Sequence, residues 1–576
     1  MRTVEELEIR YTQFPEPQQQ PTLFQQLERH KLFFLALTLL MAFGLRVYHL
    51  DAAGLSEDET NKVFALRAYE QGDFTVNAEH PMLMKLLCYA STRSAKVWNH
   101  HIGNQVNLSI AEETALRFPN ALFGALTVIP LFLLMTALLG LANGMITTLF
   151  WTFGLNAIWF NRLTKEDSLL LFFVLLGFYF YNRAKGCADY DLSGQERYYA
   201  LAGAAFGLML SSKYFPHFIG LNAIFYTLVG YDSRTNRPLT KRMWAKYFGA
   251  LALAFTICNP AIFSPQALRY VWAYVNEDLL THHGYMVMDR LFTNAPGDMP
   301  FGNPVYFYWL YLAVKAPLPI VVAFVVGLIE IFRHRGAPEV ARGYLFLRIM
   351  LVFWLLPMSL LGAKFLRYSL TLMPLVYATA AVGVLAIGRL VATALRRVAV
   401  SYSIAQQAPQ IAVAGLFVVA SALTTLIWGL PLQGIYTNAL GGGRVGYYFP
   451  HDEFYDVGAR ESIRFIAENA PPNATIISEI PGVVQYYLER YKRPDIRSII
   501  LSQPDFELRK DHLNYVILQR GRIYFENQGN FAYIKSSFPR VQTSLYNGAA
   551  ASEVFRVESE PATANLSPAP AASAAP

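Results

Sequence analysis

The sequence contains the apolar run "LFFLALTLLMAFGLRVYHL" (residues 32–50), and "DAAGLSEDETNKVFALRAYE" (residues 51–70) follows it directly. The first stretch is long enough to cross the hydrocarbon core of a bilayer as a helix, which needs about 20 mostly apolar residues. Three consecutive acids, Glu57, Asp58 and Glu59, stand a few residues beyond it. An apolar span that ends beside a group of acids predicts a membrane protein with chemistry at one face of the bilayer.

The composition supports a membrane location. Hydrophobic residues make up 54% of the 576-residue chain and charged residues 15%, against about 45–50% and 25% in soluble domains. The formal charge of +7 is attributed to basic loops that set membrane topology, so no nucleic-acid partner is expected. Three cysteines lie far apart, at positions 88, 187 and 258, and give neither a disulfide framework nor a metal-ligand spacing.

About eleven stretches are apolar enough to be candidate spans. They start near Leu32, Phe118, Leu141, Ser168, Tyr198, Pro216, Tyr247, Pro304, Tyr344, Tyr368 and Ile411. Alternate loops such as "DSRTNRPLTKRMWAK" and "GRLVATALRRVAV" are clearly basic, which places them and the N-terminus in the cytoplasm. With an odd number of spans, the C-terminal region lies on the extracytoplasmic side, in the periplasm or its equivalent. The expected fold is therefore an all-α polytopic membrane domain.

The chain divides into four parts. We expect a cytoplasmic segment at 1–31, a membrane domain at 32–430 with a long extracytoplasmic loop at 51–113, an extracytoplasmic domain at 431–557 and a disordered tail at 558–576. The third part alternates amphipathic helices with β-rich stretches, "ATIISE" and "YVILQ", as small α/β domains do. The tail is rich in Ala, Pro and Ser, and cannot bury enough apolar surface to offset its ordering entropy.

Further ionisable residues recur at the predicted outer ends of the spans. They are Arg117, Arg162, Asp167, Lys213 and Arg367, and the long outer loop adds Glu79 and His80 in "EHPMLMKLL". Ionisable groups near membrane depth indicate function by default, although a single arginine there often only snorkels or sets topology. The acids after Ser56 also have an ordinary interpretation, because acids are favoured in the first turn of a helix.

Taken together, cations and carboxylates at one membrane face suit an anionic lipid head group and a reacting hydroxyl. The cations would hold and neutralise a phosphate, and a carboxylate would act as general base. This combination indicates transfer of a sugar from a polyprenyl phosphate.

Five motifs occur in the order found in a known family. The acidic pair Asp58-Glu59, "HPMLMKLL", "RFPNALFGAL", "NRLTKEDSLLLFF" and "GLMLSSKY" resemble the family 39 glycosyltransferases of the C-type fold (GT-C), which include protein O-mannosyltransferases and bacterial lipid A aminoarabinose transferases. The late stretch "RYSLTLMP" is also similar to the latter group. Two positions depart from the patterns: Met82 replaces a proline of the mannosyltransferases, and His80 replaces a lysine of the aminoarabinose transferases.

The resemblance implies a mechanism and roles. Asp58 would take the proton from an acceptor hydroxyl during a single inverting displacement, with Glu59 the next candidate. The cations Lys213, Arg117 and Arg367 would stabilise charge on the leaving phosphate. Glu59 and Asp167 would orient sugar or acceptor groups or pair with those cations. Arg162, Glu79 and His80 complete the candidate substrate-binding set.

His282 and His283 are adjacent on a predicted outside loop. They could contact the donor phosphate or, with Glu79, hold a metal ion. Two neighbouring histidines without a metal-ligand spacing more often form a hydrogen-bonding or solvated pair. We therefore expect no cofactor and assign no metal ligands, while a divalent metal stays an open alternative.

The sequence thus favours an enzyme of the plasma (inner) membrane with its active site outside the cytoplasm. Its partners would be a polyprenyl-phosphate sugar donor, membrane lipids and an unspecified acceptor on a protein, lipid or glycan. A lipid or solute transporter or flippase is the first alternative, although such proteins tend to show inverted repeats and none is visible. An inactive relative of the same fold is the second.

Overall fold

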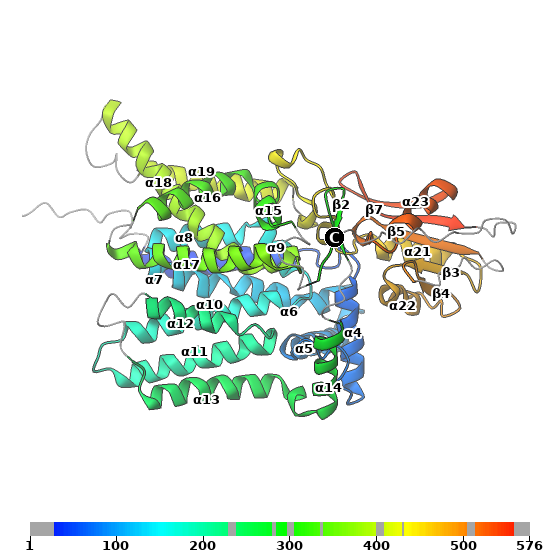
Figure 1. The fold of residues 1–576 in the computed structure, drawn as a ribbon, viewed down its shortest axis with the longest axis horizontal. Helices are drawn as coiled ribbons and strands as arrows, with labels where there is room; N and C mark the ends of the chain where they lie inside the picture. Colours follow the sequence, from blue (N-terminus) through cyan, green and yellow to red (C-terminus); the bar gives the residue numbers. More distant parts are fainter. Residues whose placement is uncertain are drawn as a thin grey trace, which may run out of the picture.

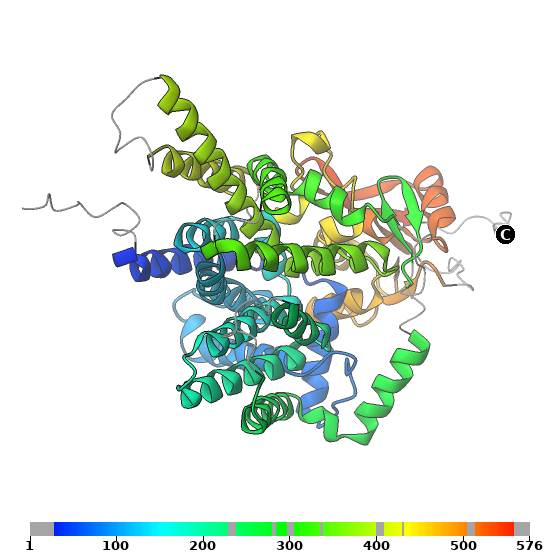
Figure 2. The same cartoon turned by 60° about the vertical axis from the view of Figure 1, so that its left-hand side comes forward.

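The computed structural model describes residues 28–228, 238–278, 284–295, 304–334, 338–398, 408–428, 431–503 and 513–557. The expected disordered tail and nearly all of the expected cytoplasmic segment lie outside these ranges. Long helices run side by side through most of the molecule, and a small sheet with its own helices lies at one end of them (Figures 1 and 2).

The helices of the bundle are mostly apolar. They are α3 (Lys31–Val47), α6 (Glu112–Leu126), α7 (Val128–Leu139), α8 (Leu141–Thr152), α9 (Leu155–Asn161), α10 (Asp167–Gly186), α11 (Leu192–Ser212), α12 (His217–Leu228), α13 (Lys241–Cys258), α15 (Phe307–Lys315), α16 (Leu318–Arg333), α17 (Pro338–Leu360), α18 (Met373–Val398) and α19 (Ala408–Trp428). Small residues allow close packing: a Cβ on Gly203 of α11 would lie 2.0 Å from the carbonyl oxygen of Tyr247 in α13. Such contacts are typical of helix pairs in membranes.

Among the described residues, four helical segments are long and apolar enough to cross a membrane, judged by length and composition: Glu112–Leu139, Val340–Leu360, Met373–Leu395 and Ala408–Trp428. The expected count of eleven is therefore not confirmed. Several predicted spans form helices that are short, such as the 17-residue α3, or that carry charges at their ends, such as α10, which begins at Asp167.

The elements between the bundle and the sheet form a layer at the end of the bundle (Figure 1). The expected loop at 51–113 contains α4 (Glu57–Glu70), α5 (Leu83–Trp98) and η1 (Asn99–Gly103). The remaining short elements of the chain before the C-terminal part are η2 (Pro260–Phe263), α14 (Pro265–Ala273), η3 (Tyr274–Asp278), β1 (Tyr285–Val287), β2 (Arg290–Phe292), η4 (Leu366–Thr371), η5 (Gln433–Ile435) and η6 (Ala439–Gly441).

The C-terminal part has the alternating helices and strands that the sequence indicates. In order they are α20 (Pro450–Phe454), α21 (Ala459–Asn469), β3 (Thr475–Ser478), α22 (Pro481–Arg490), β4 (Arg497–Ile500), β5 (Asn514–Gln519), η7 (Arg520–Arg522), α23 (Gln528–Ser537), β6 (Arg540–Tyr546) and β7 (Ala549–Val557). The sheet order is β4-β3-β5-β7-β6. Strands β4, β3 and β5 are parallel, whereas β7 is antiparallel to both β5 and β6.

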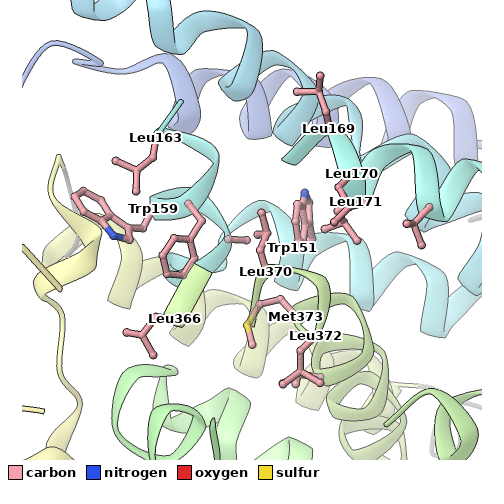
Figure 3. Packing of buried hydrophobic residues seen from close by; sticks show 14 of the residues in the cluster. Trp151, Trp159, Leu163, Leu169, Leu170, Leu171, Leu366, Leu370, Leu372 and Met373 are labelled. Atoms are coloured by element: carbon pink, nitrogen blue, oxygen red, sulfur yellow. The ribbon is translucent and has the colours of Figure 1, made fainter. Parts of the chain in front are cut away.

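One hydrophobic cluster extends from the bundle into the C-terminal part. It includes Trp151 and Leu370 in the bundle and Ile463 and Tyr487 near the sheet, each buried. Figure 3 shows Trp151, Leu370 and Met373 packed between the helices. A second cluster, on the face of the sheet that α23 covers, includes Phe531. Because the first cluster is continuous, the C-terminal helices α21 and α22 are fixed against the membrane domain, although the domain boundary at 431 stays a prediction.

Candidate active site

Asp58 lies in the first turn of α4, between the bundle and the C-terminal part. Ser56 is the N-cap of this helix, and Glu59 completes a capping box with it, which fixes the start of the helix. Asp58 therefore points away from the helix axis next to a well-ordered turn. About a third of its side chain, 34%, is exposed, so a substrate can reach the carboxylate.

Three side chains from distant parts of the chain contact the Asp58 carboxylate. The Lys165 Nζ lies 2.7 Å from Oδ1, and an Arg367 terminal nitrogen lies 3.5 Å from Oδ2. The hydroxyl of Tyr455 donates a hydrogen bond to Oδ2. Burial of the carboxyl favours its neutral form, but the charges of Lys165, Arg367 and Lys62 outweigh burial and hold the pKa of Asp58 well below its usual range. Asp58 is therefore a carboxylate at neutral pH.

A second ion pair lies behind the first. The Lys62 Nζ is 2.9 Å from Oε1 of Glu166, and both side chains are 1% exposed. Burial opposes the charge on Lys62, but Glu166 and Asp58 raise its pKa. Burial and the surrounding lysines lower the pKa of His80 to about 3, against the opposing charge of Glu166. His80 is thus neutral at physiological pH and supplies no positive charge for a phosphate.

Two buried lysines near this group have lowered pKa values. Burial, Arg367 and Lys62 lower the pKa of Lys165 to about 8, although Asp58 opposes the shift. Lys85, from "HPMLMKLL", has a pKa lowered to about 7 mainly by burial, and donates hydrogen bonds to the carbonyl oxygens of residues 77 and 80. The charge state of both lysines is therefore sensitive to an anion beside them.

The predicted residues Lys213 and Arg367 both lie over the ring of Tyr368, and Asp167 pairs with Lys213. The Lys213 Nζ lies 2.7 Å from Oδ1 of Asp167 and 4.5 Å from the ring centre of Tyr368. The Arg367 guanidinium lies 4.1 Å from the ring centre of Phe365. Oδ2 of Asp167 and Nε of Arg367 are buried without a hydrogen-bond partner, so Arg367 retains donor capacity for an anion.

Glu59 pairs with Arg117, one of the two roles expected of it. Arg117 donates from Nε and one terminal nitrogen to both oxygens of Glu59, at 2.8 and 2.7 Å. Its remaining N–H groups bond the carbonyl oxygens of residues 50, 53 and 54 at 2.7–2.8 Å. Glu59 is fully buried and also accepts from the backbone N–H groups of Ser56 and Thr164. With every N–H of Arg117 engaged, this pair holds the loop and leaves no donor for a phosphate.

Arg162 is also used within the protein. It is 4% exposed, and one terminal nitrogen bonds the carbonyl oxygen of His49 at 2.7 Å while the other bonds that of Tyr48. These carbonyl groups lie just past the end of α3, where a cation stabilises the helix dipole. The structure thus places Arg162 at the end of α3, and its expected role in substrate binding stays a prediction.

Glu79 lies outside the group around Asp58. Its Oε1 accepts a hydrogen bond of 2.5 Å from the side chain of Asn77, while Oε2 is buried without a partner. His282 and His283 fall outside the described residues, so the expected contact with Glu79 stays untested. Across the ranges that the structure describes, no group of three or more His, Cys, Asp or Glu side chains could hold a metal ion.

A narrow pocket lies beside the lysine-rich side of this site. His80, Lys85 and Tyr69 line it together with apolar residues of η2 and α14. The Tyr69 hydroxyl is buried without a partner. The pocket therefore has an apolar side, formed by η2 and α14, and a polar end, formed by His80, Lys85 and Tyr69.

Sequence reasoning missed Lys165, Glu166, Lys62 and Tyr455. The first two stand in the motif "NRLTKED", so their adjacency to Asp167 was an available signal. Lys62 follows Asp58 by four residues, which places both on one helix face. Tyr455 carries no signal in the sequence, because only the fold brings it to Asp58.

One family of known proteins matches part of the chain. Residues 98–263 match the family model "Dolichyl-phosphate-mannose-protein mannosyltransferase", which confirms the resemblance over α6 to α13 but does not include Asp58. No curated protein matches the sequence. The chain is thus a multi-pass membrane protein with a segment similar to protein mannosyltransferases.

Three solved structures resemble the chain at low identity. ArnT from Cupriavidus metallidurans in the apo state has 14% identity and a TM-score of 0.48, over 92% of this chain and 98% of that one. AglB from Archaeoglobus fulgidus, in complex with an inhibitory peptide and a dolichol-phosphate, has 10% identity and a TM-score of 0.47, over 91% and 74%. The S. cerevisiae Pmt1-Pmt2 complex bound to the sugar donor has 17% identity and a TM-score of 0.33, over 42% and 34%.

Proposed function

We propose that the protein is a membrane glycosyltransferase that moves a sugar from a polyprenyl-phosphate donor to an acceptor hydroxyl at the extracytoplasmic face. The observation that carries this proposal is the partly exposed Asp58 carboxylate held between Lys165 and Arg367. In a displacement at a sugar phosphate, the carboxylate can accept the proton of the attacking hydroxyl, and the two cations can stabilise the leaving phosphate. The family match over residues 98–263 agrees with a lipid-linked donor.

Donor binding begins with the phosphate. Arg367 has an unpartnered buried Nε and only a long 3.5 Å contact with Asp58, so its guanidinium is available for a phosphate oxygen. Lys165, at 2.7 Å from Asp58, supplies a second cation. Lys213 stays paired with Asp167 and adds positive charge beside Tyr368. The pocket lined by Lys85 and Tyr69 offers an apolar surface to the start of the lipid chain.

An exchange of partners then activates the base. Without donor, Lys165 and Arg367 hold Asp58 ionised and make it a weak base. When a phosphate draws these cations away, the carboxylate loses the charges that stabilise its ionised form, so its pKa rises. A general base works best when its pKa approaches the working pH. Donor binding and base strength are coupled in this way.

The displacement follows. The acceptor oxygen attacks the anomeric carbon from the side opposite the phosphate, and its proton passes to Asp58. The bond from that carbon to the phosphate oxygen breaks, and its electron pair stays on the phosphate. Lys165 and Arg367 stabilise this charge, so no strong general acid is required. A single displacement inverts the configuration at the anomeric carbon.

The test is a transfer assay with purified protein in nanodiscs, labelled polyprenyl-phosphate sugars and a membrane extract as the acceptor pool. We expect transfer by the parent protein and by Asp51→Asn, a matched control in the exposed loop before α4, and none by folded Asp58→Asn. The labelled product identifies the sugar and the acceptor. Full transfer by Asp58→Asn would overturn Asp58 as the base. Donor binding without transfer from any donor would favour a transporter or an inactive relative.

A further inference from the structure

Tyr455 reaches the proposed base from the far end of the chain. It follows α20, is 6% exposed, and its hydroxyl donates to Oδ2 of Asp58 across 397 residues of sequence. Burial and the Asp58 charge raise the pKa of this hydroxyl far above its usual value, so it remains protonated and can only donate to the carboxylate.

The turn that carries Tyr455 is fixed in an unusual conformation. Tyr455 has φ of 47° and Asp456 has φ of 61°, a left-handed region that non-glycine residues seldom adopt. Asp456 accepts a hydrogen bond from the backbone N–H of Glu57 at 3.0 Å and pairs with Arg522 at 2.6 and 2.8 Å. Arg522 also contacts Glu57 at 2.7 Å. The C-terminal part thus binds the first turn of α4, which contains Asp58, through a hydrogen bond and an ion pair to Glu57.

We propose that the C-terminal part is a component of the active site, in which Tyr455 is a positioning residue that orients Asp58 and holds it ionised until the donor binds. This inference rests on the proposed function and adds a role for residues beyond the membrane domain. The contact that carries it is with the proposed base itself.

The alternative is that Tyr455 only joins the two parts of the protein. The same interface contains a suitable control: the Tyr486 hydroxyl donates to Glu112 Oε2 at 2.8 Å. Tyr486→Phe removes one hydrogen bond between the parts without touching Asp58. A purely structural role predicts equal effects of Tyr455→Phe and Tyr486→Phe.

A positioning role predicts unequal effects. The charged groups that face Asp58 are Lys62 on its own helix, Lys165 before α10 and Arg367 in η4, and Tyr455→Phe leaves all three in place. Loss of one hydrogen bond to a carboxylate raises its pKa by about one unit or more. The protonated fraction of Asp58 at a fixed pH then rises about tenfold for each unit.

Carbodiimide labelling measures this fraction without requiring transfer, because the reagent attacks the protonated carboxyl. The rate at which Asp58 is modified would be followed by mass spectrometry of its peptide, in full-length protein at pH 5 to 8. We expect modification about tenfold faster in Tyr455→Phe than in the parent, and an unchanged rate in Tyr486→Phe. Equal rates in all three proteins would overturn the inference.

The pH dependence of transfer gives a second readout. The acidic limb of kcat/KM, which reports the enzyme before the donor binds, should move to higher pH in Tyr455→Phe and stay in place in Tyr486→Phe. If Tyr455→Phe does not fold, fluorotyrosine at position 455 is the second variant, because it keeps the ring and makes the hydroxyl a stronger donor. Carbodiimide modification of Asp58 should then be slower than in the parent. An unchanged modification rate would overturn the inference. A labelling difference without any transfer would support the effect of Tyr455 on Asp58 but refute the proposed function, and with it a place for Tyr455 in an active site. Transfer with unchanged labelling would support the proposed function and overturn the inference.

Discussion

Replacing Arg117 by Met tests whether the Arg117–Glu59 pair is structural. Arg117 donates to Glu59 at 2.8 and 2.7 Å and to the carbonyl oxygens of residues 50, 53 and 54. Its side chain is 4% exposed and that of Glu59 is 0% exposed, so water cannot replace the lost partner. Removing one member of such a pair costs about 3–5 kcal/mol, because a buried charge is left uncompensated. We therefore expect Arg117→Met to lower the free energy of unfolding by this amount.

The assay is the unfolding midpoint of purified protein in detergent, followed by near-UV circular dichroism, for Arg117→Met, Glu59→Gln and the double variant. The two single changes should not add, because the double variant leaves no unpaired charge. We expect the double variant to be at least as stable as Arg117→Met. An Arg117→Met protein with the parent's midpoint and lost donor binding would refute this reasoning and return Arg117 to the phosphate site.

Three other predictions concern the charges around Asp58. Lys165→Met should reduce transfer by about 100-fold, the usual effect of losing one donor to a developing anion, with the unfolding midpoint checked in parallel; unchanged transfer would remove Lys165 from the mechanism. Because the pKa of Lys165 is about 8, the donor dissociation constant should rise about tenfold per pH unit above 8 as the amine loses its proton. Binding titrations with Lys165→Arg should lack this rise below pH 10. A parallel rise in both proteins would contradict the role of Lys165 in donor binding. The folded-state pKa of Asp58 lies below its usual value, so its ionisation stabilises the protein above about pH 4, and this contribution is lost as the pH falls further. The acid-unfolding curve of Asp58→Asn should therefore lack this dependence. Superimposable curves for Asp58→Asn and the parent protein would argue against the lowered pKa.

Local features of the sequence predicted much of the architecture. Apolar runs predicted the helix bundle, because a chain in a bilayer must satisfy its backbone within helices. The acids after Ser56 were typical of a helix start, and α4 begins there with a capping box. The strands in "ATIISE" and "YVILQ" correspond to β3 and β5. These patterns depend on neighbouring residues, so the sequence alone carries them. The number of membrane spans was harder to predict from the sequence, because helices with charged ends or fewer than 18 residues are only just long and apolar enough to cross a bilayer.

The partners of each charged residue were decided by the tertiary structure. Sequence reasoning placed Asp58, Asp167, Lys213 and Arg367 at one face, and the structure brings them together. It could not separate Arg117 from them, because a cation that holds a loop and one that binds a phosphate look alike in sequence. Glu59 and Arg117 are 58 residues apart, and Asp58 and Tyr455 are 397 apart. Such contacts depend on how whole elements pack, and packing is a property of the fold rather than of any local pattern.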